Sequence, residues 1–219
     1  MTIKVAVLSF SNISADARVL RQVEFLLPHY DVSVIGYGEG LPSPLASASF
    51  YPVPRSGDLP LKLRRLAYRA IGWQFPRPAF ERLAWSKPES RRALSILLEL
   101  KPDIIHANEL ETLPVAVCAA ESSNARIILD LHEYSPLEME DSPLWKRLYQ
   151  PYVEYLLKRY VPNVFASVTV GEAIANRYAD EYGFRPLTVM NAPALDKSVD
   201  FRPSQADCIR LVHHGGALP

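Results

Sequence analysis

The chain has 219 residues, of which 48% are hydrophobic and 22% charged, so it can build a core and is not a disordered polymer. Its 24 Lys and Arg residues balance its 24 Asp and Glu residues, which excludes a global positive field that recruits nucleic acid. Its length suits one large domain or two small ones.

Neither the cysteines nor the apolar stretches indicate a secreted or membrane-spanning protein. Cys118 and Cys208 cannot form a disulfide framework, and we interpret them as reduced structural thiols of a cytosolic protein. No stretch approaches the ~20 apolar residues that cross a bilayer. The apolar N-terminus lacks the charged leader and small-residue cleavage site of a signal peptide.

The first 37 residues are predicted to form a strand, a helix and a second strand. Residues 3–10 are the first strand, a polar loop follows over 11–15, and residues 31–37 are the second strand. The helix between them has Ser14 or Asp16 as its candidate N-cap, and Pro28 stops it. Its apolar stripe consists of Val19, Leu20, Val23, Leu26 and Leu27. Such a unit predicts a right-handed crossover between parallel strands.

The next segment contains glycines and then a basic, aromatic stretch. The glycines of residues 36–40 are followed by prolines instead of the helix that holds a pyrophosphate, which argues against NAD binding. A short third strand is predicted over 50–53. The stretch Leu59–Phe75 either presents a solvated basic face or binds an anionic membrane surface or anionic substrate. Its basic residues are Lys62, Arg64, Arg65 and Arg69.

Strands and helices keep alternating to the end of the chain. Ser86 and Glu89 match a capping box, which predicts a helix that carries Leu94, Leu97 and Leu98. A long helix over 142–160 should be kinked or divided at Pro151. The other predicted strands are 103–107, 126–131, 166–170, 187–190 and one that begins at 209, and the other predicted helices are 114–120 and 171–182, the latter ended by Gly183.

This alternation predicts an α/β fold with a doubly wound, mostly parallel, Rossmann-like sheet. Ligands of such sheets bind over the carboxyl ends of the strands. The polar segments at these ends are 11–16, 108–111, 130–134 and Asn191. His132 is the leading candidate for chemistry, since an imidazole can donate or accept a proton near neutral pH. The alternative is a structural histidine satisfied by Asp130 or by a backbone carbonyl.

Signatures of other chemistry are weak. His213 and His214 are adjacent, so on a strand they point to opposite faces, and neither they nor His106 has a third ligand at convincing spacing. The sequence has no nucleophile elbow and no P-loop.

Five motifs occur in a characteristic order. They are Asp16-Ala17-Arg18-Val19-Leu20-Arg21, Asp130-Leu131-His132-Glu133, Thr169-Val170-Gly171-Glu172, Tyr182-Gly183 with Val189-Met190-Asn191-Ala192-Pro193, and His213-His214-Gly215-Gly216. With these motifs the whole chain resembles the N-terminal domain of family-four glycosyltransferases with the GT-B fold.

The resemblance implies two Rossmann-like domains, of which residues 1–207 are the acceptor-side one and 208–219 begin a missing domain that binds a nucleotide-sugar. It implies retention of anomeric configuration, no cofactor, no metal, and a role such as polysaccharide biosynthesis. His132 would be catalytic, contacting the transferred sugar, and Gly215 and Gly216 would approach the donor diphosphate. The residues implied to bind a glycan, lipid-linked or small-molecule acceptor are Ser11, Asn12, Asp16, Arg18, Asn108, Glu109, Glu133 and Asn191.

The chain departs from the family pattern because the second domain is absent. Two acidic residues eight apart hold the donor in that domain; Glu81 with Glu89 and Glu172 with Asp180 have the spacing but fall in the first domain. We therefore expect a fragment or a natural half that needs a partner in cis or in trans and is inactive alone. Alternative functions are a non-catalytic module that binds a glycan or a partner, and half of a GT-B-like sugar-nucleotide epimerase. We expect a cytoplasmic protein, peripheral at the inner face of a membrane if Leu59–Phe75 binds lipid.

Overall fold

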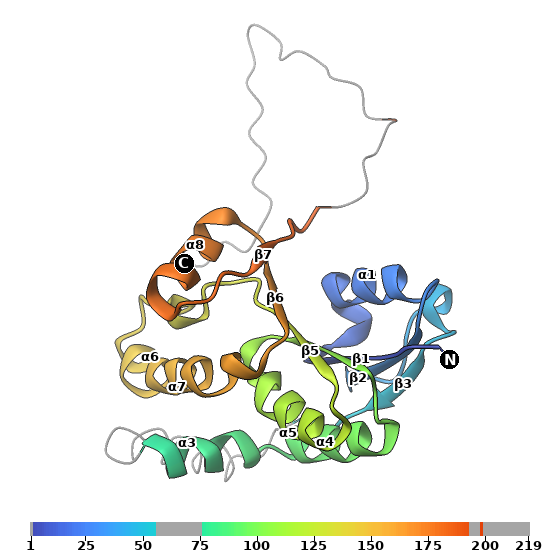
Figure 1. The fold of residues 1–219 in the computed structure, drawn as a ribbon, viewed down its shortest axis with the longest axis horizontal. Coiled ribbons are helices and arrows are strands. Elements are labelled where there is room, and N and C mark those ends of the chain that lie inside the picture. Colours follow the sequence, from blue (N-terminus) through green and yellow to red (C-terminus); the bar gives the residue numbers. More distant parts are fainter. Residues whose placement is uncertain (1, 56–75, 193–197, 199–219) are drawn as a thin grey trace, which may run out of the picture.

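A computed structural model of the protein describes residues 2–55, 76–192 and 198 (Figure 1). In these residues the strands form one seven-stranded sheet in the order β3-β2-β1-β4-β5-β6-β7, and every neighbouring pair is parallel. The strands are β1 (Lys4–Asn12), β2 (Asp31–Tyr37), β3 (Ser49–Pro52), β4 (Ile104–Asn108), β5 (Arg126–Asp130), β6 (Ala166–Thr169) and β7 (Leu187–Thr188). The predicted doubly wound parallel sheet is confirmed.

Helices cover both faces of the sheet, as Figure 1 shows with α1 on one side and α4 and α5 on the other. The helices are α1 (Ala17–Leu26), α3 (Pro76–Trp85), α4 (Pro88–Leu100), α5 (Leu113–Ser123), α6 (Pro143–Leu148), α7 (Gln150–Tyr160) and α8 (Glu172–Tyr182). Short 3-10 turns join several of them: η1 (Ile13–Ala15), η2 (Ser43–Leu45), η3 (Leu110–Thr112), η4 (Ser135–Leu137) and η5 (Val161–Asn163).

The core is split into two layers because successive side chains of a strand point to opposite faces. Val5 and Val7 pack with Val19 and Val23 of α1, in the smaller layer. Ala6 and Leu8 of the same strand belong to the larger layer, which α3, α4, α5, α7 and α8 cover. Buried on both sides, β1 therefore has the nearly continuous apolar run that marks a central parallel strand.

The strand order reverses between β1 and β4. The chain runs outward from β1 through β2 to β3, then returns to the other side of β1 and continues from β4 to β7. In open α/β sheets, ligands bind beyond the carboxyl ends of the strands at such a switch point. The tips of β1, β4 and β5 are therefore the place to look for a site.

Several local predictions hold at the level of individual residues. Asp16 is the N-cap of α1, since its side chain accepts from the backbone N–H groups of Arg18 (3.2 Å) and Val19 (3.1 Å). The long helix is divided, with α6 and α7 meeting at Tyr149. Gly183 ends α8 with a φ of 74°.

The capping box at Ser86 is wrong. Lys87 occupies the N-cap position of α4, and the Ser86 hydroxyl donates instead to the Leu83 carbonyl oxygen at 2.8 Å. Ser86 follows the end of α3, a helix absent from the sequence interpretation, and its hydroxyl satisfies a carbonyl of that helix. The apolar face of α4 also differs, because Leu98 is exposed while Leu97 is buried.

Some predictions fall outside the described residues. These are the basic stretch Leu59–Phe75, Cys208, the strand from 209, the domain boundary after 207 and the segment His213–Gly216. In the part of the chain that is described, no helix combines the length and apolarity needed to cross a membrane.

Candidate functional site

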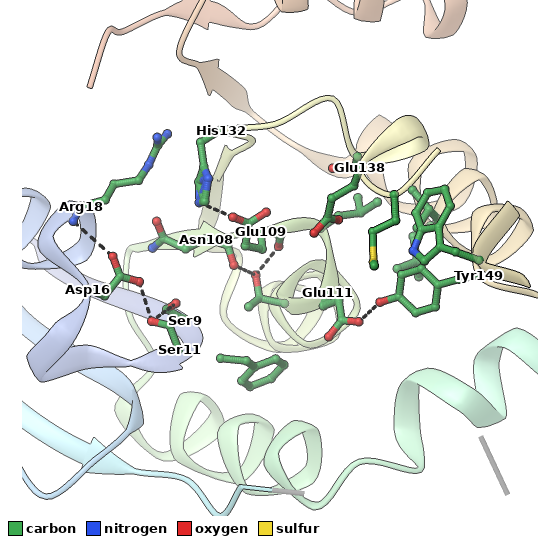
Figure 2. A pocket seen from close by; sticks show the side chains of 18 of the residues that line it. Ser9, Ser11, Asp16, Arg18, Asn108, Glu109, Glu111, His132, Glu138 and Tyr149 are labelled. Carbon is green, nitrogen blue, oxygen red and sulfur yellow. Dashed lines mark hydrogen bonds and ion pairs between the residues drawn. The ribbon is translucent and has the colours of Figure 1, made fainter. Parts of the chain in front are cut away.

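A cavity of about 710 Å³ opens over the carboxyl ends of β1, β4 and β5 (Figure 2). A second hollow of about 460 Å³ adjoins it and shares four of its lining residues: Ser11, Asp16, Arg18 and His132. His132 therefore stands between the two spaces. This is the rim on which the sequence placed the candidate site.

The first loop is held by a chain of hydrogen bonds that centres on Asp16. The Ser11 hydroxyl donates to Asp16 Oδ2 at 2.6 Å and lies 2.9 Å from the Ser9 hydroxyl. The other oxygen of Asp16 caps α1. Asp16 thus fixes the loop against the helix N-terminus and leaves the serine hydroxyls beside the cavity.

Arg18 is fixed by a buried carboxylate at the tip of β5. Its Nε donates to Asp130 Oδ2 at 2.8 Å, and its terminal nitrogen pairs with Oδ1. Gln22 donates to the same carboxylate at 2.6 Å, and Asp130 is only 2% exposed. The Asp130 side chain is thus taken up by Arg18 and Gln22, and no contact between it and the His132 imidazole is found.

His132 pairs with Glu109. Its Nε2 contacts Glu109 Oε1, which Figure 2 shows reaching across from the tip of β4. The Glu109 backbone has a positive φ of 67° with ψ 150°, a conformation that non-glycine residues rarely adopt. Its N–H donates to the Asp130 carbonyl at 3.0 Å, and its carbonyl accepts from the Thr112 hydroxyl at 2.8 Å. Strained non-glycine residues of this kind cluster at functional sites and persist only where the surroundings hold them.

The surroundings favour the uncharged forms of both partners. Burial, followed by the nearby carboxylates of Glu138, Asp130 and Glu133, raises the pKa of Glu109 to about 8. Burial, followed by the positive charge of Arg18, lowers the pKa of His132. These shifts favour a neutral pair at neutral pH, in which the Glu109 carboxyl shares its proton with the imidazole. The pair can hold or pass one proton at the mouth of both spaces.

The far wall of the cavity is apolar and comes from α6 and α7. Trp145 and Tyr149 pack against each other with ring centroids 5.8 Å apart. The Tyr149 hydroxyl donates to Glu111, which also pairs with Lys87. The sequence interpretation did not assign these residues to the site. The sequence feature that could have pointed to this wall is the aromatic content of the helix predicted over 142–160. The helical periodicity of the sequence alone does not show which face of that helix meets the sheet.

The structure brings most of the predicted site residues to this rim. Asn108 and Glu109 line the main cavity, and Asn12 and Asn191 line the smaller hollow. Glu133 lines neither; it is exposed, and its carbonyl accepts from the Tyr178 hydroxyl at 3.0 Å. Gly215 and Gly216 lie outside the described residues. Among residues 2–55, 76–192 and 198, no three His, Cys, Asp or Glu side chains group as metal ligands.

Comparison with known proteins identifies the fold and the sequence family. The sequence profile of Glycosyltransferase Family 4 matches residues 19–191. Among curated proteins, no significant match is found.

Three solved structures illustrate the likeness of fold. Sucrose-phosphate synthase from Thermosynechococcus elongatus is 12% identical with a TM-score of 0.55, over 86% of this chain and 47% of that one. Glycyrrhiza uralensis UGT73P12, complexed with glycyrrhetinic acid 3-O-monoglucuronide, is 15% identical with a TM-score of 0.53, over 87% and 49%. Anabaena HepE in complex with UDP-glucose is 15% identical with a TM-score of 0.50, over 86% and 43%. The chain thus spans about half the length of each of these proteins.

Proposed function

The chain belongs to Glycosyltransferase Family 4, and we propose that it is the acceptor-side half of a retaining enzyme that transfers a sugar from a nucleotide-sugar. The observation that carries the proposal is the cavity of about 710 Å³ beside His132, at the switch point of the sheet. It is large enough for a drug-sized acceptor. Its mouth holds a proton-sharing pair, which a purely structural surface does not need.

In this proposal the acceptor occupies the main cavity and the transferred sugar lies against His132, over the smaller hollow. Transfer breaks the bond from the anomeric carbon to the diphosphate oxygen and forms a bond from that carbon to the acceptor oxygen. The hydroxyl proton of the acceptor leaves with the diphosphate. Retention requires that the acceptor attack from the face that the diphosphate leaves.

His132 serves this reaction by hydrogen bonding to the sugar at the reacting end. Donation from Glu109 to Nε2 fixes the tautomer and leaves Nδ1 of the imidazole as an N–H donor. Such a donor stabilises charge that develops during transfer, and a preorganised donor of this kind contributes about 2.7–4 kcal/mol to a barrier. The loop of Ser11 and Asp16 and the pair of Arg18 with Asp130 hold the rim in place around it.

The donor is bound by a second half of the enzyme. The solved structures with the same fold are about twice as long as this chain, which supports a requirement for more protein in cis or in trans. The 219 residues alone are therefore expected to transfer no sugar. The donor contact at Gly215 and Gly216 and the absence of a metal requirement are part of the proposal, as are a cytoplasmic location and contact of Leu59–Phe75 with an anionic membrane.

The test is His132→Ala in a polypeptide that joins this chain to its donor-binding half. We expect turnover to fall by about 10²–10³-fold, which is the usual loss when one preorganised donor is removed. Stability should change little, because the His132 side chain is 35% exposed. His29→Ala is the matched control, since His29 is exposed and lines neither space. Near-parent turnover of His132→Ala, or its unfolding, would show that His132 is structural.

A further inference from the structure

The cavity wall formed by α6 and the turn before it presents apolar side chains that no other part of the described chain covers. Met139 and Leu144 line the cavity although they are 55% and 66% exposed. Deeper in the same wall, Val153 and Leu156 are buried, and Trp145 packs at a tilt against Tyr149. Pockets lined in this way bind ligands with apolar bodies.

The polar side of the cavity is acidic. Its lining includes the carboxyl groups of Asp16, Glu109, Glu111 and Glu138, visible around the space in Figure 2. Burial, followed by the charges of Glu133 and Glu111, raises the pKa of Glu138, as burial and Glu138 do for Glu109. Glu138 thus makes ionisation of Glu109 harder, and Glu133 and Glu111 do the same for Glu138. A further negative charge placed here would be disfavoured by the same burial and by those carboxyl groups that are ionised.

Among the residues that the structure describes, no cation on this wall is free to receive an anion. Arg18 is the one Lys or Arg among the described residues that line the cavity, and its guanidinium is held by Asp130. Lys87, behind the lining, is paired with Glu111. A phosphate would therefore have to break a buried ion pair to gain a partner, and breaking such a pair is unfavourable.

One buried oxygen in the lining lacks a donor. Asn108 is 2% exposed, and its Nδ2 donates to the Leu8 carbonyl at 3.4 Å. Its Oδ1 has no hydrogen-bond partner among the described residues. The oxygen itself has almost no accessible surface, so a small turn of the Asn108 side chain would have to bring it to the cavity; unsatisfied buried acceptors are costly, and the oxygen would then gain from a ligand group that donates a hydrogen bond, such as a hydroxyl. An anionic oxygen could not supply that bond.

From these observations we infer that the acceptor is an uncharged, apolar alcohol or phenol, whose body lies on the wall of α6 and whose hydroxyl lies near Asn108 and His132. The inference rests on the proposed function, which it narrows, because it selects a small apolar hydroxyl compound over a phosphorylated or lipid-phosphate-linked acceptor. The volume of about 710 Å³ fits such a compound of several rings.

The first test compares two probes that share one apolar ring system and differ in charge. 2-Naphthol is uncharged at neutral pH and carries a hydroxyl, and 2-naphthyl phosphate is an anion. Their affinities for the 219-residue protein are measured by isothermal titration calorimetry at pH 7. We expect 2-naphthol to bind at least about tenfold more tightly, because like charges inside the cavity disfavour the phosphate. Equal or tighter binding of the phosphate, or no binding of 2-naphthol, would overturn the inference.

Two pairs of variants assign the binding to this cavity. Glu138→Gln removes one carboxyl group from the lining, so the affinity for 2-naphthyl phosphate should rise about threefold while the affinity for 2-naphthol stays the same. Its control is Glu140→Gln, because Glu140 is an exposed neighbour that does not line the cavity, and this variant should change neither affinity. Leu144→Ser should weaken 2-naphthol binding about fivefold through lost apolar contact, whereas Leu187→Ser, equally exposed at 65% but elsewhere, should not. If the controls matched the cavity variants, the probe would bind elsewhere and the inference would fail.

The inference about the acceptor and the proposed function can be refuted by different results. The probes need no donor, so their binding does not depend on catalysis. If 2-naphthol binds as expected but the joined enzyme transfers sugar only to phosphorylated acceptors, the inference fails while the proposed function stands. If the probes discriminate and no sugar transfer occurs, the cavity is as inferred and the proposed function is wrong.

Discussion

Replacing Arg18 by Met should destabilise the protein strongly, because it strands a buried carboxylate. Asp130 accepts from two nitrogens of Arg18 and from Gln22, and the exposed fractions of the paired side chains are 14% for Arg18 and 3% for Asp130. Breaking a buried pair costs about 3–5 kcal/mol. The hydrogen bond from Gln22 remains, so we expect the low end, about 3 kcal/mol of unfolding free energy.

Urea unfolding followed by circular dichroism measures this loss. With a denaturant slope of about 2 kcal/mol per molar, the midpoint should fall by about 1.5 M. Adding Asp130→Asn to Arg18→Met removes the stranded charge and keeps an acceptor for Gln22. The double variant should therefore recover about 2 kcal/mol of the loss.

The same substitution should change the electrostatics of the site. Arg18 is the second cause, after burial, of the low pKa of His132, so Arg18→Met should raise that pKa. Nitrogen NMR of the imidazole across pH 4–9 would follow it, with His132→Gln to assign the signals. A loss below about 1 kcal/mol, no rescue by the double variant, or an unchanged pKa would refute the role given to this pair.

Two further substitutions test the site pair and the end of α8. The pKa of Glu109 is raised to about 8, so the transfer rate of the joined enzyme should decline as pH rises through about 8. Glu109→Gln keeps a hydrogen-bond donor and cannot ionise, so this decline should be absent from its pH–rate profile. If the decline persisted in the variant, a group other than Glu109 would be its cause. Because the folded value exceeds the unfolded value of about 4.3, this carboxyl also reduces stability progressively as pH rises between the two. Gly183→Ala should cost about 1 kcal/mol in urea unfolding because φ is 74°, whereas Gly40→Ala, in open space without a left-handed φ, should cost little; equal effects would refute the backbone argument.

The strands and their polar tips could be predicted from the sequence because a single local pattern encodes both. A buried parallel strand needs an apolar run, and its polar end marks the ligand edge, as at residues 126–131. The cap at Asp16 was also local, since capping depends on groups two or three residues away. The capping box at Ser86 was predicted wrongly because it, too, was judged only from residues close in the sequence. Its motif is correct in spacing, but the neighbouring helix α3 already takes its hydroxyl.

The partner of His132 could not be predicted, because it depends on strand register. In the sheet Asn108 lies opposite Asp130, which carries Glu109 beside the segment after β5. A shift of one residue would have changed this neighbour, and the sequence does not specify the register. The apolar wall was missed for a similar reason. The orientation of α6 depends on the break at Tyr149, and only packing against the sheet determines which side chains face the cavity.

The most direct test of the central claim measures turnover of a panel of nucleotide-sugars by two proteins. One is the chain of residues 1–219, and the other is the longer polypeptide that adds a donor-binding half. With 2-naphthol as acceptor, mass spectrometry would detect a glycoside, and NMR of its anomeric centre would show whether it keeps the configuration of the donor. The account predicts this product from the longer polypeptide and none from the chain alone. A glycoside formed by residues 1–219 without the donor half, or no glycoside of any acceptor from the joined halves, would contradict it.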